Sequence, residues 1–241
     1  RGIPFHLPRA AWPAGFLSGL LFAFEFMCLF TALDLTTVSR TSIIFYSMPV
    51  WLALFAHVLI PGEQLTRARV VGLILAMCGV AIALADRSSG AASWAGDLMA
   101  LASAFCWAAI ALCVRVTPLS QVPPAPQLLC QVTVSAPLLI GVSVFFGPLI
   151  RDLQPVHLAG MAFQIVAVAS LGFMFWFWLM KLYPASGVAS FSFLSPVFAV
   201  LLGWLLLQEQ VGLSIWIALA MVAAGIYLIN RPAVRPAEQL S

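Results

Sequence analysis

Residues 26–82 read FMCLFTALDLTTVSRTSIIFYSMPVWLALFAHVLIPGEQLTRARVVGLILAMCGVAI, and residues 173–228 read FMFWFWLMKLYPASGVASFSFLSPVFAVLLGWLLLQEQVGLSIWIALAMVAAGIYL. The most specific matches between them lie at a shift of 147 or 146 positions and pair Pro49 with Pro196, Glu63 with Glu209, and Gly79 with Gly225. Leucine matches are common in so apolar a chain, but a proline, an acid and a glycine in the same order are not. We therefore interpret the two stretches as copies of one unit.

The composition predicts that this unit lies in a lipid bilayer. Hydrophobic residues make up 63% of the 241 residues and charged residues 8%, whereas soluble domains have about 25% charged residues. The net charge of +3 comes from short loops, so no nucleic-acid partner is indicated. The five cysteines lie in apolar segments without a CxxC spacing, which is typical of small core residues. The chain is therefore predicted to be a polytopic membrane protein.

Apolar runs of about 20 residues, the length that crosses a hydrocarbon core of about 30 Å, occur eight times. They cover residues 12–35, 41–60, 68–85, 94–116, 127–147, 157–180, 188–207 and 212–230. Eight Lys and Arg residues fall on one side of these spans and three on the other, and the richer side is expected to face the cytoplasm. We therefore expect a multi-pass protein of the plasma membrane, or bacterial inner membrane, with both termini cytoplasmic.

The second copy begins five helices after the first, and this odd offset turns it upside down in the membrane. Inverted repeats let one unit present alternative packings to the two sides, as in secondary transporters. We divide the chain into residues 1–88, a first repeat of three helices, residues 89–232, a second repeat of five, and residues 233–241, a cytoplasmic tail. Because the second repeat has two helices without a counterpart, we infer that about 50 residues forming two helices precede Arg1. A genuine eight-helix protein is the alternative.

The pattern ALDLTTVSRTSIIFYSMPVWLAL, followed by GEQLT and GLILAMCGVAIAL, with GDLMALASAFCWAA opening the second half, resembles the EamA-type transporters of the drug/metabolite transporter superfamily. The resemblance covers nearly the whole chain. It implies ten helices, arranged as two inverted five-helix domains around a central cavity, and the movement of small metabolites. This chain departs from the pattern by lacking the first two helices. The expected fold class is an all-α polytopic membrane protein with an inverted repeat of five-helix units, of which the first is incomplete.

Pro49 and Pro196 occupy matching positions in mid-span. Each removes a backbone hydrogen bond and bends its helix, and a paired break in two repeats indicates a hinge or a binding site. A kink that merely fits neighbouring helices is the alternative. Hydroxyl groups cluster nearby, and we expect four of them to contribute to a substrate site: Tyr46, Ser47, Ser192 and Ser195. Such hydroxyls could equally satisfy backbone carbonyls that the prolines leave free.

Glu25 is the only acidic residue deep inside a predicted span, near the middle of residues 12–35. An ionisable group at the bilayer centre costs roughly 3 kcal/mol on insertion scales and usually faces an interior cavity. No Lys or Arg lies at comparable depth. We therefore predict that Glu25 faces a central, water-accessible cavity flanked by the helices of Pro49 and Pro196, and that it binds a proton or a substrate amine. A structural pair with a neighbouring polar group is the alternative.

Three further features carry weaker expectations. Trp176, in the aromatic run at residues 173–178, could stack on a planar substrate, although packing and lipid contact are common for such residues. Glu63 and Glu209 each precede a helix, where an acid stabilises the N-terminus, so we expect both to act as helix caps. His57 is expected to be a hydrogen-bonded packing residue.

These observations favour a secondary transporter. No HExxH, GxSxG or phosphate-cradling motif occurs, so neither an enzyme nor an ATP-driven pump is indicated. We predict an exporter of small organic metabolites or drugs that works by alternating access around a midplane cavity, with coupling to protons kept as an option. No cofactor or metal is expected, and a homodimer is kept as an option. An intramembrane enzyme and a non-transporting membrane scaffold are the alternatives.

Overall fold

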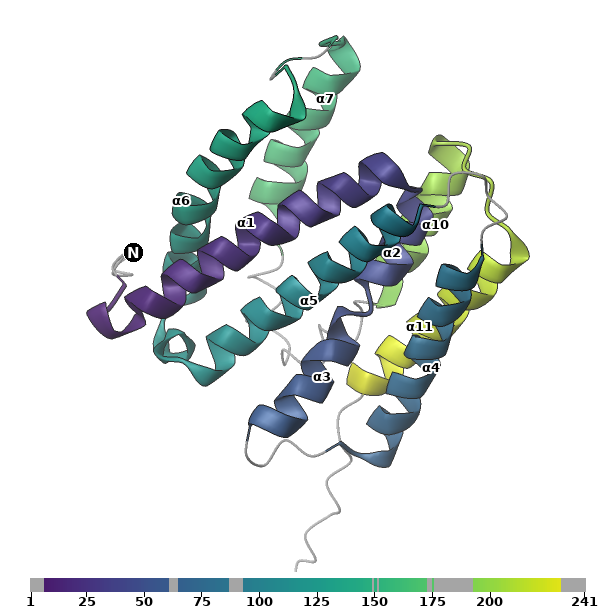
Figure 1. Cartoon of the computed structure of the whole chain (residues 1–241), viewed down its shortest axis with the longest axis horizontal. Helices are drawn as coiled ribbons and strands as arrows, with labels where there is room; N and C mark the ends of the chain where they lie inside the picture. The colour runs from purple at the N-terminus through teal and green to yellow at the C-terminus, as the bar shows by residue number, and fades with distance from the viewer. Residues whose placement is uncertain are drawn as a thin grey trace, which may run out of the picture.

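The computed structural model describes residues 7–60, 65–86, 93–148, 150, 152–172, 175 and 193–230. Over these residues the chain is a bundle of helices (Figure 1). In chain order these are η1 Arg9–Ala11, α1 Trp12–Leu35, α2 Val38–Phe45, α3 Met48–Leu59, α4 Arg67–Ala85, α5 Trp94–Val116, η2 Pro118–Gln121, α6 Pro124–Ser143, η3 Val144–Phe146, α7 Pro155–Phe163, the π-helix η4 Gln164–Gly172, α10 Leu194–Leu206 and α11 Leu213–Asn230.

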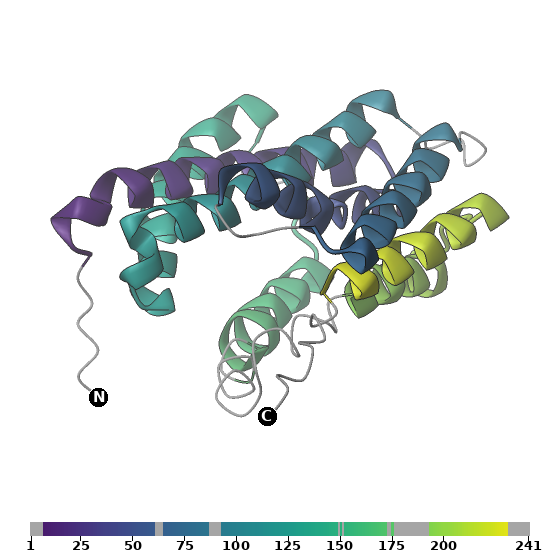
Figure 2. The same ribbon diagram turned by 90° about the horizontal axis from the view of Figure 1, so that it is seen from below.

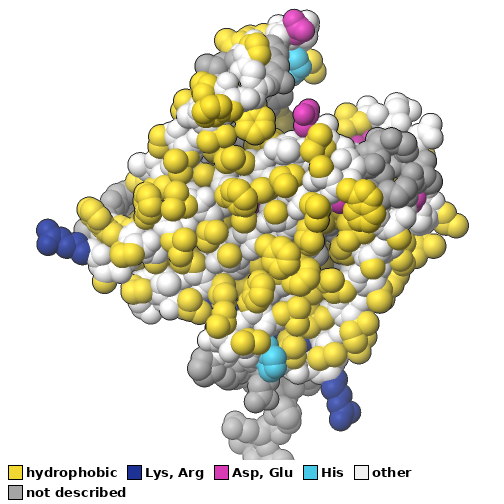
Figure 3. Space-filling model, viewed as in Figure 1, with side chains coloured by type: hydrophobic (Ala, Val, Ile, Leu, Met, Phe, Trp, Pro, Cys, Tyr) yellow, Lys and Arg dark blue, Asp and Glu magenta, His cyan; other side chains and the backbone are white. Residues whose placement is uncertain are grey.

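The helices confirm the expected all-α membrane fold class. Seven helical stretches of the described chain are long and apolar enough to cross a bilayer, and α10 is a shorter apolar helix at the place of the remaining predicted span. Hydrophobic side chains cover most of the face in Figure 3, as expected of surfaces that meet lipid instead of water. The protein is therefore an integral multi-pass membrane protein.

The span predicted at residues 41–60 begins earlier than expected and is interrupted. It consists of α2 and α3, which meet at Tyr46 and Ser47. Pro49 lies at the start of α3, where its missing N–H would lack a helical partner in any case. The Ser47 hydroxyl donates to the Ile44 carbonyl at 2.6 Å and accepts from the Trp51 indole at 3.0 Å. Backbone hydrogen bonds from the Ser47 N–H to the Ile44 carbonyl and from the Val50 N–H to the Ser47 carbonyl also bridge the junction, as a break at membrane depth requires.

Helices α4 and α11 pack side by side and antiparallel (Figures 1 and 2). A Cβ atom built on Gly72 would lie 2.8 Å from the Gly225 carbonyl oxygen, and one on Gly225 would lie 2.6 Å from the Gly72 carbonyl oxygen. A Cβ on Gly79 would lie 2.7 Å from the carbonyl oxygen of Ala218. No side chain fits at these contacts, so the small residues let the two backbones touch, which is how helices associate where lipid removes the hydrophobic drive.

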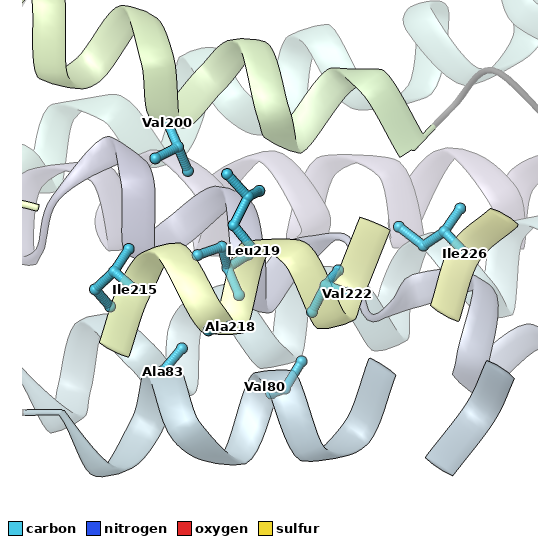
Figure 4. Close-up of a cluster of buried hydrophobic side chains, with 9 residues drawn as sticks. Val80, Ala83, Val200, Ile215, Ala218, Leu219, Val222 and Ile226 are labelled. Atoms are coloured by element: carbon cyan, nitrogen blue, oxygen red, sulfur yellow. The ribbon is translucent and has the colours of Figure 1, made fainter. Parts of the chain in front are cut away.

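One apolar core joins these two helices to α2 and α10 (Figure 4). Its members are all buried: Ile43, Val80, Ala83, Val200, Ile215, Ala218, Leu219, Val222 and Ile226. Because the core contains residues from before position 87 and after position 192, it holds helices α2 and α4 against helices α10 and α11.

Helix α1 is held between two neighbours. Towards α5 it runs antiparallel, since Gly96 near the start of α5 lies against Thr36 and the Cys113 thiol near its end contacts the Ala14 carbonyl. Towards α6 it runs parallel, and Gln131 of α6 donates to the Ser18 hydroxyl at 2.5 Å. By contrast, the side chains described for α7 and η4 are nearly all exposed.

Candidate functional site

Helices α1, α4 and α10 end, and helices α2, α5 and α11 begin, at one end of the bundle (Figure 1). Polar side chains in these helices and next to them make contacts there. We call this region the Arg40 end. It matters for function because residues of the first predicted repeat, 1–88, contact residues of the second predicted repeat, 89–232, in this region. Three sets of polar contacts connect these two parts of the chain.

The first contact is a buried ion pair between α2 and α5. Nη2 of Arg40 lies 2.8 Å from Oδ2 of Asp97, and Nε donates to Oδ1 at 3.3 Å. Both side chains are 1% exposed. Nη1 of Arg40 donates to the Asp86 carbonyl, which follows α4. A two-point contact of this kind combines strength with a fixed orientation, so the guanidinium ties α2 to α5 and to the end of α4.

The second contact is a helix cap made by Glu209. Its Oε1 accepts from the backbone N–H of Val38 at 2.7 Å, and its Oε2 accepts from the N–H of Ser39 at 3.1 Å and from the Ser39 hydroxyl. These N–H groups belong to the first turn of α2, which has no helical acceptor for them. The carboxylate also suits the positive end of the helix dipole.

This cap corrects the sequence-based expectation for Glu209. We expected an acid ahead of α11 to serve that helix, but it serves α2, some 170 positions earlier in the chain. The reason lies in the turn that ends α10: Gln208 has a positive φ of 53°, and the N–H of Glu209 returns to the Gly203 carbonyl at 3.1 Å. This left-handed turn leaves Glu209 within reach of α2. Gly203 provides the space, since a Cβ there would lie 2.8 Å from the Glu209 carboxylate.

The third contact joins α4 to α11. The hydroxyl of Ser214, in the first turn of α11, donates to the carboxylate of Asp86. Sequence reasoning predicted none of the three contacts, because it gave no role to Arg40, Asp86 or Asp97 and placed the Glu209 cap on the following helix. The signal was present in the short stretches Ser39-Arg40 and Gly96-Asp97, where a charge sits beside a small residue at the edge of an apolar run.

Glu25 lies apart from these contacts, on α1 where it faces α5. Its side chain is 3% exposed, and the Cys106 thiol of α5 lies close to it and to Cys28. Within the described structure, Oε2 of Glu25 is buried and makes no hydrogen bond. The hydroxyl of Ser103, one turn from Cys106, is likewise buried without a hydrogen bond there. A buried acceptor that the protein leaves unpaired normally costs about 1–3 kcal/mol.

The other predicted site residues fall into two groups. Tyr46 and Ser47 lie on the connection between α2 and α3, where Tyr46 packs against the apolar core. Ser195 and the buried Pro196 lie in the first turn of α10. Two further candidates, Ser192 and Trp176, lie outside the described residues, as does Glu63. Glu25 shares no hydrogen bond with the described members, so their joint role stays a prediction.

A cavity of about 420 Å³ lies between α1 and α6. It is lined by Met27, Phe30, Thr31, Asp34, Leu139, Val142, Ser143 and Phe146. Glu25 is not among its lining residues. Among the described residues, no group of His, Cys, Asp and Glu side chains is arranged to hold a metal ion.

Comparison with known proteins identifies the family. The EamA-like transporter family matches residues 1–85 and 94–231. The uncharacterized transporter YvbV of Bacillus subtilis is 30% identical over 225 residues, which are 92% of this chain and 73% of YvbV. The aromatic amino acid exporter YddG of Ancylobacter novellus is 32% identical over 92 residues, 37% of this chain and 31% of YddG. A solved crystal structure superposes with a TM-score of 0.60 at 26% identity, covering 93% of this chain and 77% of its own. The chain belongs to the EamA-like transporter family and is a membrane transporter, not an enzyme.

Proposed function

We propose that the protein is a secondary exporter of small organic molecules in which two inverted repeats, residues 1–88 and 89–232, alternate access to a site at the bilayer midplane. The observation that carries this proposal is a reciprocity between α4 and α11. Gly72 lies against Gly225, and Gly79 lies against Ala218. In the repeat, which has a shift of 146 positions, Gly72 corresponds to Ala218 and Gly79 corresponds to Gly225. The contact between Gly72 and Gly225 is therefore equivalent to the contact between Ala218 and Gly79. A two-fold axis in the membrane plane produces this pattern.

The Arg40 end is the outer side in this proposal, consistent with the distribution of Lys and Arg in the sequence. The contacts of Arg40, Glu209 and Ser214 then hold the outer side closed. Alternating access requires at least part of this set to separate when the outer side opens. Pro49 and Pro196, at the starts of α3 and α10, are the proposed hinges for that movement.

Glu25 is the proposed centre of the transport site. It is buried on α1, and its Oε2 is left without a hydrogen-bond partner among the described residues. An acceptor that the resting protein does not use is available to a proton or to a substrate amine, and ionisable residues inside membrane spans mark such paths. Tyr46, Ser47, Ser192, Ser195 and Trp176 complete the proposed lining. The kinship with an aromatic amino acid exporter makes aromatic amino acids the first substrates to test.

Transport by purified protein in proteoliposomes tests this function. Vesicles preloaded with aromatic amino acids, nucleosides or vitamins are given an inward or outward proton gradient, and efflux of each compound is followed. We expect the gradient to drive efflux of at least one compound, and Glu25→Gln to reduce it or to shift its pH dependence. The matched control is Asp152→Asn, the same chemical change at an exposed loop position, which should leave efflux unchanged.

Two results would contradict the proposal. Efflux at the wild-type rate by Glu25→Gln across the whole pH range would remove Glu25 from the site. For the orientation, single cysteines are placed at exposed positions near opposite ends of the bundle, Gln154 and Ser120, in a background without the native cysteines. A maleimide that cannot cross the membrane should label Gln154→Cys from outside; labelling of Ser120→Cys instead would invert the topology.

A further inference from the structure

The cavity between α1 and α6 is separate from the proposed transport site. Its α1 residues are Met27, Phe30, Thr31 and Asp34, which form one stripe on a helix with 3.6 residues per turn. By the same geometry Glu25 lies on the opposite side of α1, roughly 170° away. The cavity also opens on the surface, since Phe30 is 60% and Phe146 54% exposed. A ligand here would therefore touch a different set of groups from one at Glu25.

The polar groups of the cavity can accept hydrogen bonds but have none to donate. The Thr31 hydroxyl donates its proton to the Met27 carbonyl at 2.7 Å, and the Ser143 hydroxyl donates to the Ile140 carbonyl at 2.7 Å. A hydroxyl has a single proton to donate, so each of these two retains only lone pairs. The third polar group, the Asp34 carboxylate, is also an acceptor. A ligand that satisfies this lining must bring the donors itself.

The charge of the cavity also favours a ligand that donates hydrogen bonds. Asp34 is the one charged residue in the lining. It lies in the last turn of α1, which contains no basic residue. The carboxylate therefore lies at the end of a helix that carries partial negative charge on its last carbonyls. Both contributions favour a cation.

The rest of the lining is apolar and suits the body of an organic molecule. Met27, Leu139, Val142 and the rings of Phe30 and Phe146 supply this surface. Aromatic rings attract organic cations through their faces, and a methionine adapts to ligands of different shape. A volume of about 420 Å³ falls within the usual range of small-molecule sites.

We propose that this cavity binds a small amphipathic amine, with the ammonium group at Asp34, Thr31 and Ser143 and the apolar body between Phe30 and Phe146. Binding in this cavity does not depend on the transport activity proposed above. An experiment can therefore disprove amine binding without disproving transport, and the reverse also holds.

Binding to the purified full chain in lipid nanodiscs tests the proposal, with calorimetric titration of 2-phenylethylamine. The uncharged analogue 2-phenylethanol has the same ring and a similar length. We expect the amine to bind at least about tenfold more tightly than the alcohol, because it forms charge-assisted hydrogen bonds. Asp34→Asn should abolish this preference, and Thr31→Val and Ser143→Ala should each weaken amine binding by a smaller factor, about two- to fivefold.

Control variants distinguish amine binding at Asp34 from binding elsewhere on the protein. Asp34 is exposed, so Asp34→Asn should fold normally, as size-exclusion chromatography would verify. Asp152→Asn, the same chemical change at an exposed loop position, should bind the amine as the wild type does. Val142→Trp, which fills the cavity, should prevent binding without removing a charge. Three results would overturn the proposal. Equal affinity for amine and alcohol would identify a purely apolar site for lipid tails, and loss of binding in Glu25→Gln would place the amine at Glu25. Absence of any amine binding would mean that the cavity is no amine site.

Discussion

Two buried regions with ionisable side chains involve helix α5, and they differ in whether these side chains have partners. At the Arg40 end, Arg40 and Asp97 satisfy each other and the guanidinium also reaches the Asp86 carbonyl. Glu25 lies beside Cys106, nine residues further along α5, with an oxygen that has no hydrogen bond in the described structure. That separation is about 13 Å along the helix. A charge with fixed partners stabilises one arrangement of helices, whereas a carboxyl group left incomplete can take up a ligand and release it.

The strongest test of this difference is to break the ion pair. Arg40→Met removes the guanidinium that forms the buried ion pair with Asp97, and this should destabilise the protein by about 3–5 kcal/mol. The measurement is thermal unfolding in detergent, followed by the loss of monodisperse protein. A second change, Asp97→Leu, should recover much of the loss, because an apolar pair needs no charge compensation. If Arg40→Met alone were as stable as the wild type, the ion pair would not hold the Arg40 end together.

The Glu209 cap should give a smaller effect in the same assay. Glu209→Gln keeps the size of the side chain but removes the charge that faces the N–H groups of Val38 and Ser39. We expect a loss of about 1–2 kcal/mol, the usual range for helix caps with charged acceptors. Gln210→Ala, at an exposed neighbouring position, is the control and should change little. Equal stabilities of the two variants would argue against the cap as a link between the halves.

Unlike the changes at Arg40 and Glu209, a change at Glu25 should affect transport more than stability. Glu25→Gln removes a carboxyl group that forms no ion pair with a described residue, so unfolding stability should change by less than about 1 kcal/mol, or rise, because no native ion pair is lost. Transport is where this variant should show its defect. A loss of stability as large as that of Arg40→Met would instead make Glu25 a structural residue with a partner.

The smallest effect is expected at Ser103, which shares the α5 face with Cys106. Its hydroxyl is buried and makes no hydrogen bond among the described residues. Replacing an unsatisfied polar group with a smaller apolar one is close to neutral or stabilising, so Ser103→Ala should shift stability by no more than about 0.5 kcal/mol. A clear destabilisation would show that the hydroxyl has a partner, such as a water molecule bridging to Glu25.

Much of the fold could be predicted because membrane insertion depends on local properties of the chain. Each backbone polar group must be satisfied within its own helix, so every span has to be a run of apolar residues that can be read from the sequence. The apolar runs and the membrane location followed from this, whereas the family followed from the resemblance of the quoted motifs. An irregularity near Pro49 could also be anticipated, because proline cannot donate a backbone hydrogen bond, but the structure places Pro49 at the start of α3 and not within a helix.

The partners of the polar groups were decided only by the tertiary structure. Glu209 precedes α11 in the chain, yet the left-handed turn at Gln208 and the space beside Gly203 bring it to α2. Asp34 faces a cavity only because α6 runs parallel to α1 at that level. A hydrogen bond or a cavity requires atoms from distant segments within a few ångströms of each other, and nothing in the spacing of residues along the chain fixes which segments meet. For the same reason, the sequence reveals that Glu25 is costly to bury but not whether a neighbour pairs with it.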